Sequence, residues 1–187
     1  MILMLRHSME TRTLVLCDEI TSESTKDFLQ AFLALDASRG PIEVRICSGG
    51  GWTGGGFAIY DAIRHAKNTV TTVGTGLVGS MATLIFQAGD KRVLMKNTAV
   101  FLHPISMGGE GYLSVLETHL QEAKRLQEQY IQEMSARTGR TVHEIKKLCS
   151  KDVFFDADEA ITYGLADEIA KRKQHPRPRP KKQKTKK

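Results

Sequence analysis

The sequence lacks the features that mark membrane and secreted proteins. No apolar run in its 187 residues approaches the roughly 20 residues that cross a bilayer. The first ten residues hold a short apolar patch without the cleavage pattern of a secretory signal. The cysteines are widely spaced, with no C-x-x-C motif and no even number for a disulfide framework; they are Cys17, Cys47 and Cys149. We therefore expect a cytoplasmic protein with reduced thiols and no membrane association.

The patterns typical of metal and nucleotide sites are also missing. There is no H-E-x-x-H and no Cys/His spacing that would bind zinc, and no G-K-[S/T] of a P-loop. Residues 49–54, "GGGWTG", match the dinucleotide fingerprint G-x-G-x-x-G. That fold needs an acidic residue about 20 positions further on, and none occurs between Asp61 and Asp90. We therefore expect no metal and no cofactor.

Acidic residues are absent from the last 17 positions, 171–187, which carry ten Lys and Arg. The other 170 residues hold 17 Lys and Arg against 21 Asp and Glu, a net charge of −4. A segment poor in apolar residues and dense in like charge cannot bury a core, so we expect a disordered basic tail over 171–187. The 41% hydrophobic content of the chain fits one globular domain, over residues 11–170, after a short N-terminal segment, 1–10.

Hydrophobic periodicity predicts strands that alternate with helices. This alternation favours an α/β fold with right-handed crossovers around a largely parallel sheet. Residues 112–137 predict one long amphipathic helix, which Gly139 ends. The expected strands are 11–17, 41–47, 69–74, 92–95 and 99–102, and the other expected helices are 22–37, 57–66, one that starts at Ser80, 141–149 and 157–164.

Six glycines occur among the eight residues 49–56, between an expected strand and an expected helix. A tight turn needs only one or two of them. Without side chains, glycines let backbone N–H groups approach a bound oxyanion closely. We therefore expect the backbone of this turn to lie against another group.

Ser80 lies at the start of an apolar helix, in "TGLVGSMATLIFQAG", residues 75–89. The first N–H groups of a helix have no partner within it, so they surround the hydroxyl with hydrogen-bond donors. On its own, such a serine usually serves as a helix N-cap. A hydroxyl in this setting is also suited to nucleophilic catalysis, provided that a base can reach it.

His103 is the best candidate for that base. It follows the apolar strand 99–102, and Pro104 restricts it to extended geometry, which fixes the direction of its ring. On its own it could equally be a partly buried loop histidine. The other histidines lie on polar helix faces or near the termini: His7, His65, His119, His143 and His175.

Asp152, in "SKDVFFDADEA", is the candidate carboxylate that would orient the histidine. It precedes two phenylalanines, and we expect these to shield it from water. Taken alone, its sequence context is typical of an acidic residue in a surface loop. Asp156 instead pairs with Glu159 as a capping box for the helix that follows.

Taken together, four segments of this chain resemble the ClpP family of serine peptidases. The order Ser, His, Asp agrees with the family, as do the steps of 23 and 49 residues between them, and the resemblance covers roughly residues 12–170. It implies a crotonase/ClpP-like α/β fold of repeated ββα units, with a largely parallel sheet and a protruding handle helix. The segments are "ICSGGGWTGGGFAIYDAI", "GLVGSMATLIFQAGDKR", "NTAVFLHPISMGGEG" and "CSKDVFFDADEAITYGLADEI".

The resemblance also implies roles for individual residues. Ser80 would be the nucleophile, His103 the general base and then the acid, and Asp152 the group that holds the histidine tautomer. The backbone N–H groups of Gly51 and Met81 would form the oxyanion hole. The implied activity is a serine endopeptidase that cuts unfolded polypeptides without a cofactor.

The family also implies an assembly. Its members form homo-oligomers, two stacked heptameric rings that enclose the active sites in a chamber. Helix 112–137 would be the handle through which the rings interlock, with "SMGGEG", residues 106–111, as a pairing edge. Only polypeptides that are already unfolded would reach the chamber.

Three features depart from the family's pattern. Gly49 stands where proline is usual, and Trp52 where a smaller side chain is usual, so we expect Trp52 to reshape the substrate pocket. Only about ten residues precede the first strand, where the family carries a helix and an axial loop that docks an AAA+ unfoldase. We therefore expect short peptides to be cleaved without such a partner.

Other functions stay open on the sequence alone. A crotonase-like enzyme acting on acyl-CoA thioesters would share the glycine turn but would not need Ser80, His103 and Asp152 together. A catalytically inactive ring subunit or scaffold would use its basic tail to bind nucleic acid or an acidic partner. A phage head-maturation protease can share the ClpP-like fold.

Overall fold

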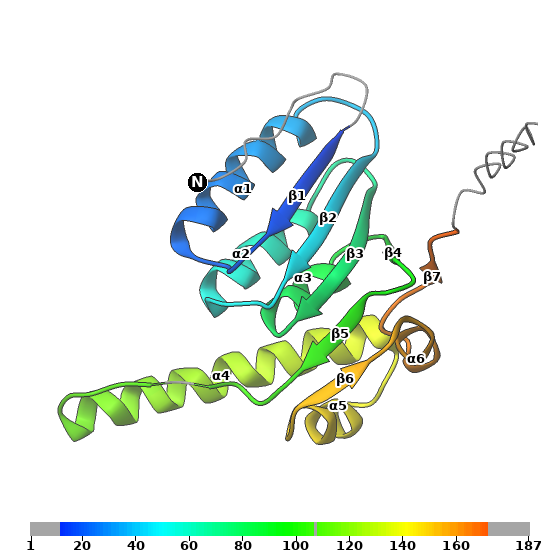
Figure 1. Cartoon of the computed structure of the whole chain (residues 1–187). Helices are drawn as coiled ribbons and strands as arrows, with labels where there is room; N and C mark the ends of the chain where they lie inside the picture. The colour runs from blue at the N-terminus through cyan, green and yellow to red at the C-terminus, as the bar shows by residue number, and fades with distance from the viewer. Residues whose placement is uncertain (1–11, 107, 172–187) are drawn as a thin grey trace, which may run out of the picture.

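The computed structural model describes residues 12–106 and 108–171. The expectations for the N-terminal segment 1–10 and for nearly all of the basic tail lie outside the described residues. Among the described residues, no helix is both long and apolar enough to cross a membrane. The chain forms the α/β architecture that the sequence predicts (Figure 1).

One sheet of seven strands organises the molecule. Five strands run in the order β1-β2-β3-β4-β7, all parallel. The far end of β3 pairs with β5, and β5 pairs with β6 in the only antiparallel ladder of the described strands. The strands are β1 Thr13–Cys17, β2 Ile42–Ser48, β3 Val70–Gly79, β4 Lys91–Leu94, β5 Ala99–Leu102, β6 Val153–Phe155 and β7 Glu168–Ile169.

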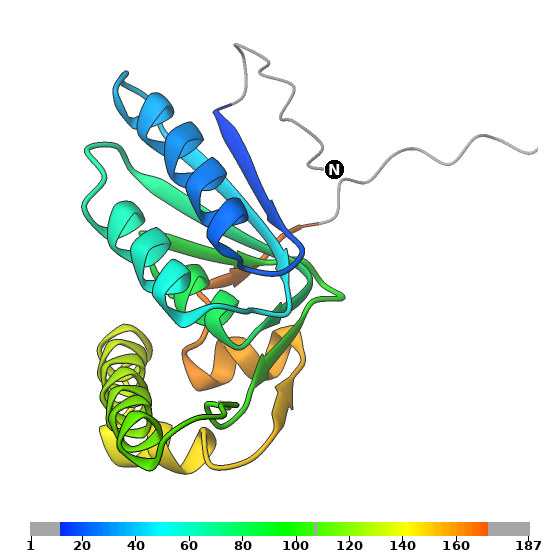
Figure 2. The same ribbon diagram turned by 90° about the vertical axis from the view of Figure 1, so that its left-hand side faces the viewer.

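Helices α1, α2 and α3 lie on one side of the sheet, and Figure 2 shows α1 and α2 there. Helix α4 extends from the sheet as a long arm (Figure 1), so the protruding helix expected over residues 112–137 is confirmed. The helices are α1 Ser22–Asp36, α2 Thr53–Arg64, α3 Met81–Gln87, α4 Leu113–Thr138, α5 Val142–Leu148 and α6 Ala157–Tyr163.

The core lies between the sheet and its helices. In β2, side chains alternate in burial, so Ile42, Val44 and Ile46 all face the helices. All seven residues of α3 are buried, which makes it the central helix. Its N-terminus nevertheless reaches the end of β3, where Ser80 lies.

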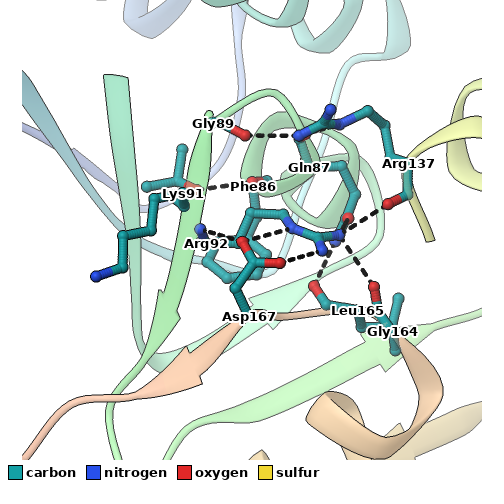
Figure 3. Close-up of polar contacts among 10 residues, drawn as sticks. Phe86, Gln87, Gly89, Lys91, Arg92, Arg137, Gly164, Leu165 and Asp167 are labelled. Atoms are coloured by element: carbon teal, nitrogen blue, oxygen red, sulfur yellow. Dashed lines mark hydrogen bonds and ion pairs between the residues drawn. The ribbon is translucent and has the colours of Figure 1, made fainter. Parts of the chain in front are cut away.

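A polar cluster around Arg92 anchors the C-terminal end of α3 (Figure 3). The buried guanidinium of Arg92 forms an ion pair with Asp167 and donates to the Gln87 side chain. It also donates to the carbonyls of Arg137, at 3.1 Å, and of Gly164, at 3.0 Å. One side chain on β4 thus connects α3, the end of α4 and the segment that leads into β7.

Arg137 completes this anchor from the last turn of α4. Its guanidinium donates to the carbonyl of Gln87 at 2.7 Å and to that of Gly89 at 2.7 Å. Carbonyls at a helix C-terminus have no partner within the helix, and these bonds satisfy them. The position of α3 is therefore set by contacts at its C-terminal end, opposite Ser80.

Two element boundaries and two short strands differ from the prediction. Strand β3 does not end near Gly74 but continues to Gly79, because β5 provides a second pairing partner. A side chain at Gly74 would lie 2.6 Å from Leu94, so that glycine belongs to a tightly packed strand rather than a loop. Helix α2 begins at Thr53, inside the glycine cluster, and β6 and β7 were not predicted.

Candidate active site

Ser80 occupies a strained turn between β3 and α3. Its φ of 51° and ψ of −126° lie outside the regions that residues with a side chain normally adopt. Its hydroxyl makes no capping hydrogen bond to α3, so Ser80 does not act as an ordinary N-cap. A strained strand-to-helix turn also exposes the nucleophilic serine of α/β-hydrolases.

His103 contacts that hydroxyl directly. Its Nε2 lies 2.8 Å from Ser80 Oγ. The contact arises from the pairing of β3 with β5, which aligns Gly79 with Phe101, and the Ser80 N–H donates to the Phe101 carbonyl at 2.8 Å. The His103 ring stacks on Phe101, with centroids 5.1 Å apart and planes 10° apart. His103 therefore lies directly after β5, within hydrogen-bond distance of Ser80.

Strand pairing sets Asp152 opposite His103, but their side chains form no hydrogen bond. The antiparallel register of β5 and β6 pairs Leu102 with Val153, so one further step sets His103 opposite Asp152. No hydrogen bond joins these two described residues. Asp152 is exposed, so the expected shielding by phenylalanines is wrong. The reason is that β6 is a sheet edge paired only with β5, and Phe154 is itself 62% exposed.

The glycine turn packs its backbone against the Ser80 turn, as expected. Gly50 and Gly51 have φ values of 105° and 141°, which favour glycine. A side chain at Gly50 would lie 2.6 Å from Ser80 Cβ and 2.9 Å from the Met81 nitrogen. A side chain at Gly51 would lie 2.4 Å from the carbonyl oxygen of Ile20. Both positions are therefore closed to larger residues.

The two residues expected to provide the oxyanion hole, Gly51 and Met81, lie in this turn and at the start of α3. Ile20 and Gly51 form an isolated β-bridge, in which the Ile20 N–H donates to the Gly50 carbonyl and the Trp52 N–H donates to the Ile20 carbonyl, each at 2.8 Å. The Gly51 N–H takes no part in these two hydrogen bonds. Met81 is the first residue of α3, where an N–H has no partner within the helix. Gly51 and Met81 line one cleft together with Ser80 and His103.

The rest of this cleft is largely apolar. Its walls include Phe57, Ile105, Leu126 and Tyr130, which suit an apolar group of a bound molecule. Cys149 also lines it, and burial raises the pKa of that thiol to about 11. A thiol with this pKa is protonated at neutral pH, so Cys149 does not compete with Ser80 as a nucleophile.

Trp52 does not line the cleft that holds Ser80. Its indole lies across the next turn of α2, where a side chain at Gly54 would come within 2.7 Å of the ring. It lines a neighbouring cavity of about 480 Å3, which shares Thr53, Phe57 and Leu126 with the cleft. The structure therefore does not place Trp52 in the wall of the Ser80 cleft, where it was expected to reshape the substrate pocket.

Two hydroxyl groups near Ser80 were missed in the sequence. Thr83 on α3 is fully buried, and its hydroxyl bonds to the Ser80 carbonyl and to Tyr130 on α4. The sequence shows these two residues on apolar helix faces, where they read as packing residues. The only available signal was a polar atom on each apolar face, because such an atom needs a partner when buried.

This arrangement suits acyl transfer. Acyl transfer through a covalent intermediate requires a hydroxyl within hydrogen-bond distance of a base, and Ser80 and His103 have this geometry. Among the described residues, no group of three or more His, Cys, Asp or Glu side chains is placed to hold a metal ion.

Comparison with known proteins agrees with this chemistry. A family model described as Clp protease matches residues 2–173. The ATP-dependent Clp protease proteolytic subunit of Chlorella vulgaris is 34% identical over 164 residues, covering 85% of this chain and 81% of the relative. The ATP-dependent Clp protease proteolytic subunit 2 of Borreliella burgdorferi is 33% identical over 169 residues, covering 88% and 85%. The solved structure of a ClpP1 point mutant from Listeria monocytogenes matches with a TM-score of 0.81 and 30% identity, covering 88% of this chain and 94% of that chain.

Proposed function

Because this chain belongs to the Clp protease family and is a serine-type peptidase, we propose that Ser80 and His103 are the groups that cut its peptide substrates. The observation that carries this proposal is the distance of 2.8 Å between Ser80 Oγ and His103 Nε2. It supports acyl transfer over a scaffold function, since a scaffold has no need of a strained serine paired with a histidine.

In the first half of the reaction, Ser80 Oγ attacks the carbonyl carbon of the scissile bond while His103 Nε2 takes the hydroxyl proton. The carbonyl oxygen becomes an oxyanion, which accepts hydrogen bonds from the N–H groups of Gly51 and Met81. The carbon–nitrogen bond then breaks, and His103 gives its proton to the leaving amine. In the second half, water attacks the acyl-serine in the same way.

We assign to Asp152 the role of holding the His103 ring through its Nδ1. The β5–β6 register supports this assignment, because it sets the two residues opposite each other on one face of the sheet. Asp152 is exposed in the single chain and is therefore free to rotate toward the ring. An orienting carboxylate keeps the nitrogen that faces the serine unprotonated.

We further propose that the chain works as a cytoplasmic homo-oligomer of two stacked heptameric rings, with unfolded polypeptides as substrates. Large apolar side chains stand exposed along the first half of α4, and such surfaces are usually covered by another chain. The side chains are Tyr112, Leu113, Val115 and Leu120. The three cysteines are free thiols, which suits a reducing compartment.

The relatives are named as subunits of ATP-dependent proteases. The hydrolysis step assigned to Ser80 and His103 consumes no ATP. We therefore propose that this chain cuts short peptides without a nucleotide or an AAA+ unfoldase.

The test is steady-state cleavage of a fluorogenic peptide by the full chain and its variants. Ser80→Ala should lower kcat by about 10⁴-fold or more. Ser106→Ala is the matched control, because Ser106 lines the same cleft without contacting His103. Equal rates for the parent and Ser80→Ala would refute the proposal. Complete inactivity of the parent would favour the inactive subunit or scaffold instead.

A further inference from the structure

A chain of hydroxyl groups connects the protruding helix α4 to the backbone of Ser80. The Tyr130 hydroxyl lies 2.5 Å from Thr83 Oγ1. Thr83 Oγ1 in turn lies 2.5 Å from the Ser80 carbonyl oxygen, which also accepts the Thr83 N–H at 2.9 Å. Thr83 is fully buried, so water does not replace these bonds.

The direction of the hydrogen bonds follows from counting protons. A carbonyl oxygen only accepts, so the single hydroxyl proton of Thr83 must point to Ser80. The Tyr130 hydroxyl must then donate to Thr83 Oγ1. Burial raises the pKa of Tyr130 well above its ordinary value, so this hydroxyl keeps its proton throughout the working range of pH.

The Ser80 carbonyl has a direct geometric link to the proposed oxyanion hole. It belongs to the same planar, trans peptide group as the Met81 N–H, so the two bonds point in opposite directions. Any contact that fixes the direction of the carbonyl also fixes the direction of that N–H. The need for such a contact is plain, because the Ser80 backbone is strained and would relax if it were released.

We infer that Thr83 and Tyr130 are positioning residues that aim the Met81 N–H at the oxyanion. The inference rests on the proposed function, since it assumes that Ser80 is the nucleophile. Neither side chain reacts with substrate in this role. Hydrogen bonds to the carbonyl also polarise the peptide group, which makes its N–H a stronger donor.

The hydrogen bonds from Tyr130 to Thr83 and from Thr83 to the Ser80 carbonyl form a relay, which also has a consequence for α4. Tyr130 lies on that helix, four residues before the buried Met134 that packs it into the core. A shift of α4 along or about its axis would withdraw the Tyr130 hydroxyl from Thr83. The orientation of the oxyanion donor is thus coupled to the position of the arm that extends from the sheet (Figure 1).

The experiment measures kcat and KM for a fluorogenic peptide with four variants of the full chain. Thr83→Val keeps the shape of the side chain but removes both hydroxyl bonds, and it should lower kcat about tenfold while KM stays unchanged. This is less than the roughly 10²–10³-fold cost of deleting an oxyanion donor, because the N–H is still present. Tyr130→Phe removes only the outer bond and should lower kcat about threefold, a smaller part of the same effect.

Two further variants show whether the residues act as a relay. Thr83→Ser retains the hydroxyl and should restore kcat to near the parent value. In the double variant Thr83→Val with Tyr130→Phe, kcat should equal that of Thr83→Val alone, because the outer bond has no partner once Thr83 is changed. Tyr163→Phe is the control for loss of a tyrosine hydroxyl, since Tyr163 ends α6 and does not line the cleft that holds Ser80.

Each outcome has a definite meaning. An unchanged kcat in Thr83→Val, additive losses in the double variant, or a failure of Thr83→Ser to restore kcat would overturn the relay. A change in KM alone would also overturn it, because the relay acts on the transition state. If the parent is active but Ser80→Ala is equally active, then the proposed function itself fails, and the two failures are thereby distinguished. Tyr130→Phe keeps the packing of its ring, so it tests the relay even if Thr83→Val folds poorly.

Discussion

Ser80 can hold its strained backbone only because neighbouring residues leave it room. The glycine turn contributes that room, since a side chain at Gly50 would come within 2.6 Å of Ser80 Cβ. The β5 strand contributes a fixed partner through the bond from the Ser80 N–H to the Phe101 carbonyl. Strain of this kind costs about 1–3 kcal/mol and persists only where the surroundings enforce it.

The first prediction concerns the glycine that would provide one oxyanion donor. Gly51→Ala should lower kcat by about 10²-fold or more, because its φ of 141° and the Ile20 carbonyl at 2.4 Å from the new methyl group force the turn to move. Gly49→Ala is the matched control. Its methyl group would meet only Leu77, at 4.0 Å, so peptide cleavage should stay within a few-fold of the parent. Equal activity in both variants would show that the Gly51 N–H has no part in the reaction.

The sequence predicts the location of some individual side chains well and of others poorly. Ser80 and His103 stand at element ends with distinctive neighbours, and the structure brings them within 2.8 Å. The exposure of Asp152 could not be predicted, because it depends on β6 lying at a sheet edge. The hydroxyls of Thr83 and Tyr130 were hidden on faces that look apolar in the sequence.

Among the elements, α3 has the most demanding position. Its N-terminus must meet the glycine turn and β5, while its C-terminus is held by Arg92 and Arg137 (Figure 3). A short helix of seven residues, all buried, has little freedom between these two ends. The site therefore depends on an anchor at the opposite end of the helix.

The second prediction tests that anchor. Arg92→Met should lower the free energy of unfolding by about 1–3 kcal/mol, because it leaves the buried Gln87 side chain and the carbonyls of Arg137 and Gly164 without their donor. Lys91→Met is the matched control, since the adjacent Lys91 forms only an exposed ion pair with Glu168, at 2.9 Å. Such pairs contribute about 1 kcal/mol or less. Urea unfolding followed by circular dichroism compares the two, and similar losses would contradict the anchoring role.

The third prediction concerns the pH dependence of the same cluster. Burial raises the pKa of Asp167, but hydrogen bonds from Arg92 outweigh it and hold the pKa below its usual range. The ionised carboxylate therefore stabilises the fold at pH values above its unfolded pKa, about 3.9. This contribution is lost as the pH falls through the lower folded pKa. Asp167→Asn should thus be less stable than the parent at pH 7, and the difference should shrink toward pH 3. A difference independent of pH would contradict this assignment.

The order and type of the main elements could be predicted from periodicity, because long apolar patterns specify a buried strand or helix. The exceptions share a cause. Strand β3 runs on through glycines, and α2 begins among glycines, because tight tertiary contacts override weak local propensity. β6 and β7 have only three and two residues, which is too short for a periodic signal.

Across the whole molecule, α4 is the least embedded of the described helices. Only Ile131 and Met134 are buried in its 26 residues, both near its C-terminal end. The first half carries exposed apolar side chains and reaches away from the sheet (Figure 1). In a single chain these apolar side chains stay in contact with water, whereas an assembly of identical chains can bury them.

The fourth prediction follows from this shape. Light scattering should give a mass many times 20.8 kDa for the full chain. Leu113→Asp combined with Leu120→Asp should lower that mass, because both side chains are exposed and apolar in the single chain. Lys124→Asp alters an exposed polar position of α4 and should leave the mass unchanged. A strictly monomeric and fully active parent would rule out the chamber.

The most direct test of the central claim is the site of covalent labelling by a fluorophosphonate. This reagent reacts with a serine that a neighbouring base has activated. Peptide mass mapping of the parent should find the phosphonyl adduct on Ser80 and on no other serine. Ser106→Ala should be labelled like the parent, while Ser80→Ala and His103→Ala should not be labelled. An adduct on a different serine, or undiminished labelling of His103→Ala, would contradict the assignment of Ser80 and His103 as the catalytic pair.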